Sequence, residues 1–209
     1  MLKSLLIGLT LCISFNVYAQ KTSAWILAKQ ENGIIVYTRT TANSSYKEFK
    51  AEVKIKAQLS DLLNFIKKPE YCPEWQYKCI YQLQISDQYI YKLSNLPWPL
   101  KNRYTIMKSS ESFDAKANIH TITLKNIRRE LLPKVIKNKL PKEGNTLQMH
   151  TSDGYWKFDL SQAPLIHITH QMHGDPAGII PASLANLGVI NAAFVSLNNL
   201  KKQFEMVQK

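Results

Sequence analysis

The sequence predicts an α+β fold in which a curved antiparallel sheet wraps around a long C-terminal helix. Two observations support this prediction. From residue 34 to residue 172, short segments of alternating apolar and polar residues follow one another, as in an antiparallel sheet with one buried face. After them, large apolar residues recur every three or four positions from Leu184 to Val207, which places them on one stripe of a helix. Such a stripe needs a broad apolar surface to cover.

Residues 1–19 predict a secretory signal peptide. The positive residue Lys3 is followed by a mostly apolar run that ends at Val17-Tyr18-Ala19, where small residues suit a cleavage site. The run is shorter than the roughly 20 apolar residues that a membrane-spanning helix needs. We therefore expect residues 20–209 to be exported to the periplasm. No linker or repeat divides them, so one domain is expected.

The N-terminal half is expected to contain two helices and two pairs of strands. Residues 22–30 look like a short helix, and Asn32-Gly33 marks a turn after it. Ser60 can cap a second helix, which stops before Pro69. The strands expected in this half are 34–40, 46–55, 78–85 and 89–93.

In the C-terminal half, Pro97 and Pro99 first break the strand pattern, because proline cannot donate to a sheet ladder. Pro181 then marks the first turn of the closing helix. A sheet that grips a helix leaves a concave apolar space, a geometry commonly used for hydrophobic ligands. The alternative is that the helix simply closes a solid core. The expected strands, which bring the total to eight or nine, are 104–110, 119–127, 147–151, 155–160 and 165–172.

The chain is basic, with a formal net charge of +12, and part of the excess is local. Segment 128–142 carries a cluster of basic residues, Arg128, Arg129, Lys134, Lys137, Lys139 and Lys142. This segment would suit transient contact with an anionic membrane surface, at about 1 kcal/mol for each basic residue close to it. The alternative is a solvated loop. We expect no nucleic-acid partner, since no nucleic-acid-binding motif is present, and we expect a monomer.

Two cysteines, Cys72 and Cys79, follow the leader. In an exported protein such a pair can be oxidised. The bond would contribute about 2.5 kcal/mol in the chain-entropy model. The alternative is that Cys79 is a small core residue. One pair cannot supply the four ligands of a zinc site, so no structural zinc is expected.

Three histidines, His167, His170 and His173, are the sharpest candidates for metal or acid–base chemistry. Their segment is β-branched and alternating, so we expect a strand. A period of two sends His167 and His173 to one face and His170 to the apolar face. A lone imidazole there is more often a hydrogen-bonded core residue than a ligand, and we expect no metal site. No catalytic residue is expected either, because no nucleophile elbow, P-loop or dinucleotide motif appears.

Taken in order, several segments resemble the StAR-related lipid-transfer (START) domain family over nearly all of residues 20–209. The most specific of them is Leu96-Pro97-Trp98-Pro99-Leu100-Lys101-Asn102-Arg103. Gly178-Ile179-Ile180-Pro181 is similar to the segment that begins the family's last helix. The other matching positions are Trp25, residues 32–39 and 47–51, Pro73-Glu74-Trp75, Cys79, Pro141, Gly154, Trp156, Phe158 and Asn186.

The resemblance implies a helix-grip fold with an internal hydrophobic tunnel that binds or transfers one lipid without a cofactor. Two positions depart from the family: Tyr104 stands where an acid is usual, and Gln148 where an arginine is expected. No headgroup charge is evident in residues 104–110, which favours a weakly polar ligand. Residues 174–178, whose glycines allow hinge motion, and the first turns of the last helix are the expected lid.

The expected ligand is one lipid, sterol-like, fatty acyl or phospholipid, carried or presented in the periplasm. His170 or Tyr91 would bond its hydroxyl or carbonyl. The alternative is an enzyme, of cyclase or hydrolase type, acting on a hydrophobic substrate in the same cavity. The residues expected to line the cavity are Trp75, Tyr91, Trp98, Arg103, Trp156, His170, Met172, Leu184, Leu187, Ile190 and Phe194.

Overall fold

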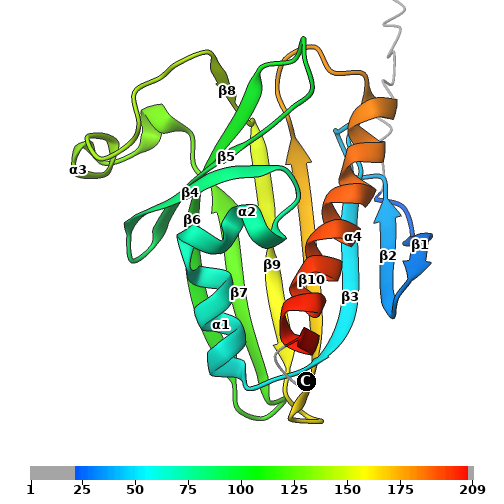
Figure 1. The fold of residues 1–209 in the computed structure, drawn as a ribbon. Helices are drawn as coiled ribbons and strands as arrows, with labels where there is room; N and C mark the ends of the chain where they lie inside the picture. The colour runs from blue at the N-terminus through cyan, green and yellow to red at the C-terminus, as the bar shows by residue number, and fades with distance from the viewer. Residues whose placement is uncertain (1–21, 207–209) are drawn as a thin grey trace, which may run out of the picture.

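One ten-stranded sheet and one long helix make up most of the computed structural model, which describes residues 22–206 (Figure 1). The strand order is β1-β2-β3-β10-β9-β7-β6-β5-β4, with antiparallel neighbours throughout; β8 lies off this path and pairs parallel with β6. The expected signal peptide, residues 1–19, lies outside the described residues. The strands are β1 (Ile26–Glu31), β2 (Ile34–Arg39), β3 (Glu48–Lys56), β4 (Cys79–Ser86), β5 (Tyr89–Ser94), β6 (Asn102–Asp114), β7 (Ile119–Asn126), β8 (Thr146–Gln148), β9 (Thr151–Asp159) and β10 (Leu165–Asp175).

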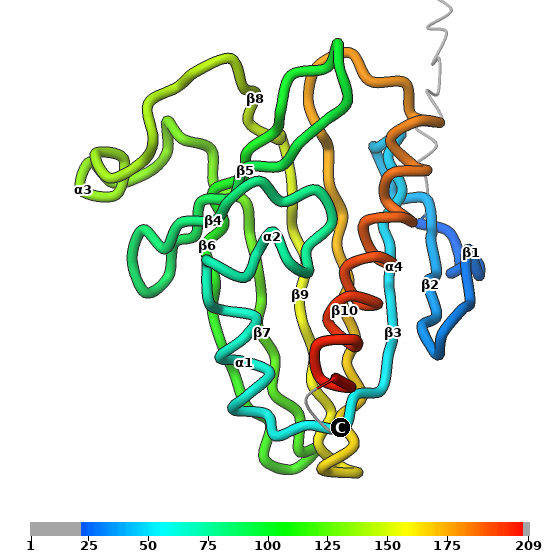
Figure 2. Tube along the Cα trace, viewed as in Figure 1, coloured from blue at the N-terminus to red at the C-terminus, as the bar shows by residue number. Residues whose placement is uncertain are grey.

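Helices α1, α2 and α4 lie against one face of this sheet (Figure 1). The longest is the closing helix, which crosses the face in front of β10 and β3. The segment with the short helix α3 lies instead at the β4–β6 end of the sheet, as the trace in Figure 2 shows. The helices are α1 (Leu59–Lys67), α2 (Cys72–Trp75), α3 (Lys134–Lys137) and α4 (Ala182–Met206), with single 3₁₀ turns at Pro69–Tyr71 and Arg129–Leu131.

The main core lies between the C-terminal half of α4 and the sheet. Leu197 and Leu200 are fully buried there. On β3, alternate residues from Phe49 to Ile55 face the helix, as the strand period of two requires. Leu184 and Leu187, at the other end of α4, remain 52% and 59% exposed. The helix therefore packs closely on the sheet along its second half only.

A second apolar cluster covers the opposite face of β4, β5 and β6. Tyr91 on β5 and Ile106 on β6 pack there against Leu132, Ile136 and Leu140. These last three come from the basic segment 128–142. The segment is therefore anchored through apolar side chains, while basic residues such as Arg128 stay exposed.

The helix predicted for residues 22–30 is wrong, because this part of the chain forms β1 and pairs with β2. Asn32 and Gly33 have φ values of 54° and 73°, the left-handed conformation that a two-residue hairpin turn needs at both positions. This turn and the edge of β2 outweigh the helix preference of the local sequence. Farther along the chain, Thr151 begins β9 instead of ending the strand before it.

Candidate functional site

A cavity of about 420 Å³ lies between the N-terminal half of α4 and the concave face of the sheet. Its volume is within the range of roughly 300–1,000 Å³ usual for ligand pockets. Leu184, Leu187 and Gly188 supply part of the α4 wall, and Trp156 and Met172 belong to the sheet floor. Both alternatives for the closing helix therefore hold in part: its second half closes a core, and its first half covers a hollow.

Seven of the residues expected at this site line the cavity. They come from α2, β6, β9, β10 and α4, which lie far apart in the sequence and are brought together by the curvature of the sheet. They are Trp75, Arg103, Trp156, His170, Met172, Leu184 and Leu187.

The other four expected residues lie elsewhere. Trp98 is 93% exposed. Tyr91 is stacked in the second apolar cluster, with ring centroids 5.9 Å from Tyr81 and 5.3 Å from Tyr104. Ile190 and Phe194 pack in the main core.

Lys92, which the sequence reasoning missed, lies in the cavity wall because it follows Tyr91 on β5 and so points to the other face. Its Nζ donates a hydrogen bond to Oε1 of Gln76 at 3.1 Å. Burial lowers the pKa of Lys92 to about 8. The alternation of β5 was the signal that could have found it, once Tyr91 was assigned to the opposite face.

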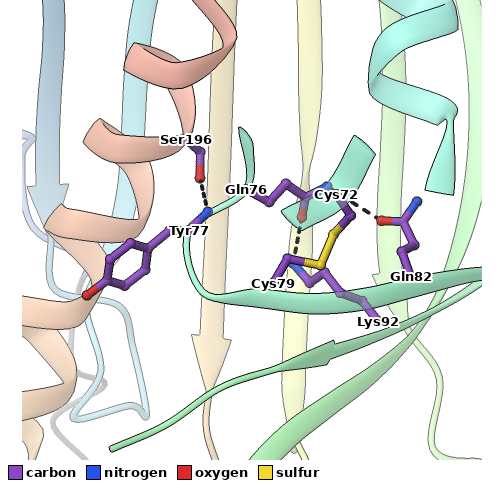
Figure 3. The surroundings of a disulfide bond; sticks show 7 residues. All are labelled: Cys72, Gln76, Tyr77, Cys79, Gln82, Lys92 and Ser196. Atoms are coloured by element: carbon purple, nitrogen blue, oxygen red, sulfur yellow. Dashed lines mark hydrogen bonds between the residues drawn. A yellow bond between two sulfur atoms is a disulfide. The ribbon is translucent and has the colours of Figure 1, made fainter. Parts of the chain in front are cut away.

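A disulfide joins Cys72 to Cys79 and closes the short segment that carries Gln76 (Figure 3). The backbone N–H of Tyr77 donates to Oγ of Ser196 on α4 at 3.0 Å. Gln76 and Tyr77 both line the cavity. The disulfide and the bond to α4 therefore fix this wall, and with it the partner of Lys92.

His170 lies on the concave face as expected and stacks on Trp156, with ring centroids 3.7 Å apart and an interplanar angle of 8°. The rings of Phe49 and His170 pack edge to face, with their centroids 5.1 Å apart. Burial, with a further contribution from the charge of Lys92, lowers the pKa of His170 to about 3. The imidazole is therefore neutral at neutral pH. Within the described chain, Nδ1 of His170 and Nε1 of Trp75 are buried without a hydrogen-bond partner.

The other two histidines of β10 lie apart from His170. His167 Nε2 is 3.9 Å from a carboxylate oxygen of Glu52. His173 Nε2 is 3.2 Å from Oγ of Ser44, and its side chain also contributes to the cavity lining. Across residues 22–206, no three His, Cys, Asp or Glu side chains gather in a way that could hold a metal ion.

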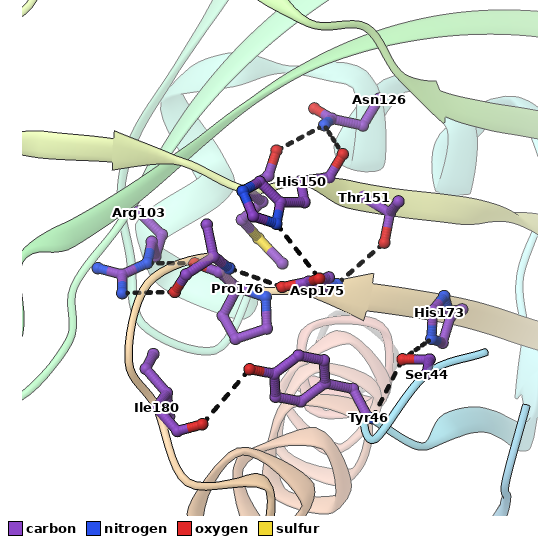
Figure 4. Close-up of polar contacts among 12 residues, drawn as sticks. Ser44, Tyr46, Arg103, Asn126, His150, Thr151, His173, Asp175, Pro176 and Ile180 are labelled. Carbon is purple, nitrogen blue, oxygen red and sulfur yellow. Dashed lines mark hydrogen bonds and ion pairs between the residues drawn. The ribbon is translucent and has the colours of Figure 1, made fainter.

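Arg103 ties the segment before α4 to the sheet (Figure 4). Its guanidinium donates to the backbone carbonyls of Lys101 and Pro176, and to that of Ala177 at 3.1 Å. The side chain is only 3% exposed, and burial lowers its pKa. Ala177 and Gly178 have left-handed φ values of 58° and 69°. Arg103 thus fixes the segment that the sequence predicted as a lid against the sheet.

The charged side chains that line the cavity all carry positive charge. They are Lys78, Lys92 and Arg103, and no Asp or Glu is found among the described residues of the lining. The cavity wall is otherwise mainly apolar and aromatic. Such a wall suits a hydrophobic molecule with one polar end. In residues 22–206, no helix has both the length and the hydropathy that crossing a membrane requires.

No family model matches the sequence. The chain is 25% identical over 185 residues to an uncharacterized protein of Pseudomonas aeruginosa, and the match covers 87% of each chain.

Solved structures give a more informative comparison. The crystal structure of a STAR-related lipid transfer protein from Xanthomonas axonopodis matches with a TM-score of 0.74 and 26% identity, over 88% of this chain and 99% of that one. Human StAR-related lipid transfer protein 5 gives a TM-score of 0.71 at 11% identity, over 91% and 90% of the two chains. Human STARD10 gives 0.69 at 18% identity, over 85% and 71%. The two human structures show the shared fold.

Proposed function

Because the chain is a structural homologue of the START domains, we propose that it binds one lipid in the cavity beneath α4 and carries or presents it in the periplasm. The observation that supports this most strongly is the hollow of about 420 Å³ left between the first half of α4 and the sheet. The disulfide between Cys72 and Cys79 suits an oxidising compartment outside the cytoplasm, in agreement with the expected signal peptide.

Ligand exchange is proposed to take place at a membrane surface. Trp98 and Ile179 are 93% and 98% exposed, and each is the neighbour of a cavity-lining residue, Pro97 and Ile180. Large apolar side chains exposed beside an opening mark a surface for membrane contact. Basic segment 128–142 would add electrostatic attraction to anionic lipids.

The free energy of moving a lipid between a bilayer and the cavity suits a carrier. Burial of each methylene removes about 0.8 kcal/mol of unfavourable hydration, so a chain of about 16 carbons gains on the order of 12 kcal/mol in the cavity. A bilayer provides most of the same gain. Transfer between the two is therefore near balance, and opening the segment that Arg103 holds becomes the slow step.

Binding is favoured over catalysis in the same cavity by the lack of a suitable proton-transfer pair. Burial lowers the pKa of His170 to about 3, so near neutral pH its imidazole is a weak base and has no imidazolium proton to give as an acid. No carboxylate among the described lining residues pairs with it.

Lipid uptake from vesicles tests the proposal. Protein unfolded, delipidated and refolded is incubated with vesicles of bacterial phospholipids and free fatty acids, separated by gel filtration, and weighed by native mass spectrometry. We expect a complex with one lipid molecule for each protein molecule, because the cavity beneath α4 is apolar over most of its surface. Refolded protein that stays empty with every lipid class, in vesicles from which other carriers take up lipid, contradicts lipid binding.

A further inference from the structure

The polar groups of the cavity are not spread evenly over its wall. Lys92 projects from β5, and Gln76 Oε1 accepts its hydrogen bond at 3.1 Å. The rings of Trp75, Trp156 and His170 form a continuous contact, with centroids 5.7 Å and 3.7 Å apart in that order. One ammonium, that of Lys92, therefore lies in the same cavity wall as two ring nitrogens, Trp75 Nε1 and His170 Nδ1, that have no hydrogen-bond partner.

Across residues 22–206, no carboxylate forms an ion pair with the ammonium of Lys92. Among the described residues, its polar partner is the neutral amide of Gln76. The cavity lining that the structure describes contains no carboxylate. An ionised amine taken out of water is costly unless it is paired, so an unpaired one facing a cavity indicates a missing anion.

The other lining cations have structural roles that Lys92 does not share. The guanidinium of Arg103 donates hydrogen bonds to three backbone carbonyls. Lys78 places its Nζ 5.2 Å from the centre of the Tyr77 ring. Lys78 is exposed to solvent, so among the described lining residues Lys92 is the partly buried cation whose charge faces the cavity.

Two further polar atoms lie in side chains of the same wall. Nε1 of Trp75 is an obligate donor, and it is buried without an acceptor. Nδ1 of His170 is also without a partner, and a neutral imidazole can carry its proton on that nitrogen. Both atoms have almost no accessible surface, so a guest reaches them only if these side chains shift, and Lys92 is the donor on which the argument rests.

We propose that the ligand is a single-chain amphiphile with an anionic headgroup, a carboxylate or a phosphate, which Lys92 binds. This inference rests on the proposed lipid binding and specifies the ligand class. The volume favours one chain, because about 420 Å³ lies toward the lower end of the range usual for ligand pockets. The weakly polar ligand expected from residues 104–110 is replaced by an anionic one, because the charge lies on the neighbouring strand β5.

A pair of fluorescent probes that differ only in the headgroup tests this assignment. We expect the protein to bind cis-parinaric acid at least about tenfold more tightly than its methyl ester, because a charge-assisted hydrogen bond is lost in the ester. Lys92→Met should remove this preference by weakening the acid and leaving the ester unchanged. Lys108→Met, which removes an exposed cation from β6 outside the cavity, is the matched control and should keep the preference.

The preference should also depend on pH. Since the pKa of Lys92 is lowered to about 8, its ammonium loses its proton between about pH 7 and about pH 9.5, and affinity for the acid should fall over that range. Affinity for the ester should stay constant. His170 is neutral throughout. The other titratable side chains of the lining, Tyr46, Tyr77, Lys78, Arg103 and His173, are unchanged in Lys92→Met, so that variant should lose the pH dependence.

The outcomes separate the two levels of the proposal. If neither probe binds the unaltered protein, lipid binding itself fails. If both probes bind equally and Lys92→Met alters neither, lipid binding stands and the anionic headgroup is refuted. Competition by hexadecanoic acid and hexadecyl phosphate distinguishes carboxylate from phosphate, and hexadecanol competing as well as both would also refute an anionic headgroup. Lys92→Met should unfold at the same temperature or higher, since it removes an unpaired, partly buried charge.

Discussion

Gly188→Trp is expected to reduce lipid uptake by more than about tenfold while the protein stays folded. Gly188 lies in α4 and lines the cavity, flanked at helical spacing by the lining residues Leu184, Ala185, Asn191 and Ala192. A Cβ built at this glycine meets no heavy atom within 4 Å. A large side chain there therefore enters open space, and the indole occupies the volume that the ligand needs.

The same substitution should not weaken the fold. Replacing a glycine inside a helix by a better helix former stabilises it by up to about 1 kcal/mol. For a domain of this size, that raises Tm by roughly 2–4 °C. Native mass spectrometry after incubation with vesicles measures the uptake, and differential scanning calorimetry measures Tm.

Gly188→Ala is the matched control. It brings an even stronger helix preference than tryptophan but adds only one methyl group, so uptake should stay at the unaltered level while Tm rises. Full uptake by a folded Gly188→Trp variant would show that the lipid occupies some place other than this cavity.

Arg103→Met is expected to lower the free energy of unfolding by roughly 3–5 kcal/mol, because three backbone carbonyls lose hydrogen bonds from a charged donor. The corresponding fall in Tm is about 10 °C. The released segment from Asp175 to Gly178 should exchange its amide hydrogens faster than in the unaltered protein. Urea unfolding measures the stability, and hydrogen exchange with mass spectrometry locates the opened segment.

Two variants show whether stability depends on the planar guanidinium group of Arg103, which reaches three carbonyls, or only on its positive charge. Arg103→Lys keeps the charge but cannot reach three carbonyls with a planar fork, so most of the loss should remain. Lys101→Met removes a neighbouring exposed cation and leaves the backbone carbonyl that Arg103 uses, so stability should not change. If Arg103→Met changed stability by less than about 1 kcal/mol and left hydrogen exchange unaltered, the segment would not depend on this side chain.

Periodicity was sufficient to predict the elements whose burial pattern is strong. The stripe from Leu197 to Phe204 marked α4, and the alternation from Leu165 to Met172 marked β10 and placed His170 on its concave face. It was not sufficient for β1. The residues of β1 favour a helix, and they form a strand because the Asn32-Gly33 turn brings them alongside β2. Pairing with β2 is tertiary information that the local sequence does not carry.

The candidate site was harder to predict because β5 is covered on both faces. Tyr91 and Leu93 pack under the α3 segment, so the apolar face of this strand points away from the cavity and the polar residue Lys92 points into it. The usual rule that apolar residues face the interior therefore selected the wrong side of β5. Arg103 was expected to line the cavity, but its hold on Ala177 depends on a loop distant in the sequence.

The most direct test of a lipid-binding interior is a crystal structure of the protein loaded with a bromine-labelled fatty acid. We expect anomalous peaks from the bromine atoms between the first half of α4 and the concave face of β9 and β10, with the carboxylate beside Lys92. Bromine peaks confined to the outer surface, or a cavity filled by the protein's own side chains, would contradict it.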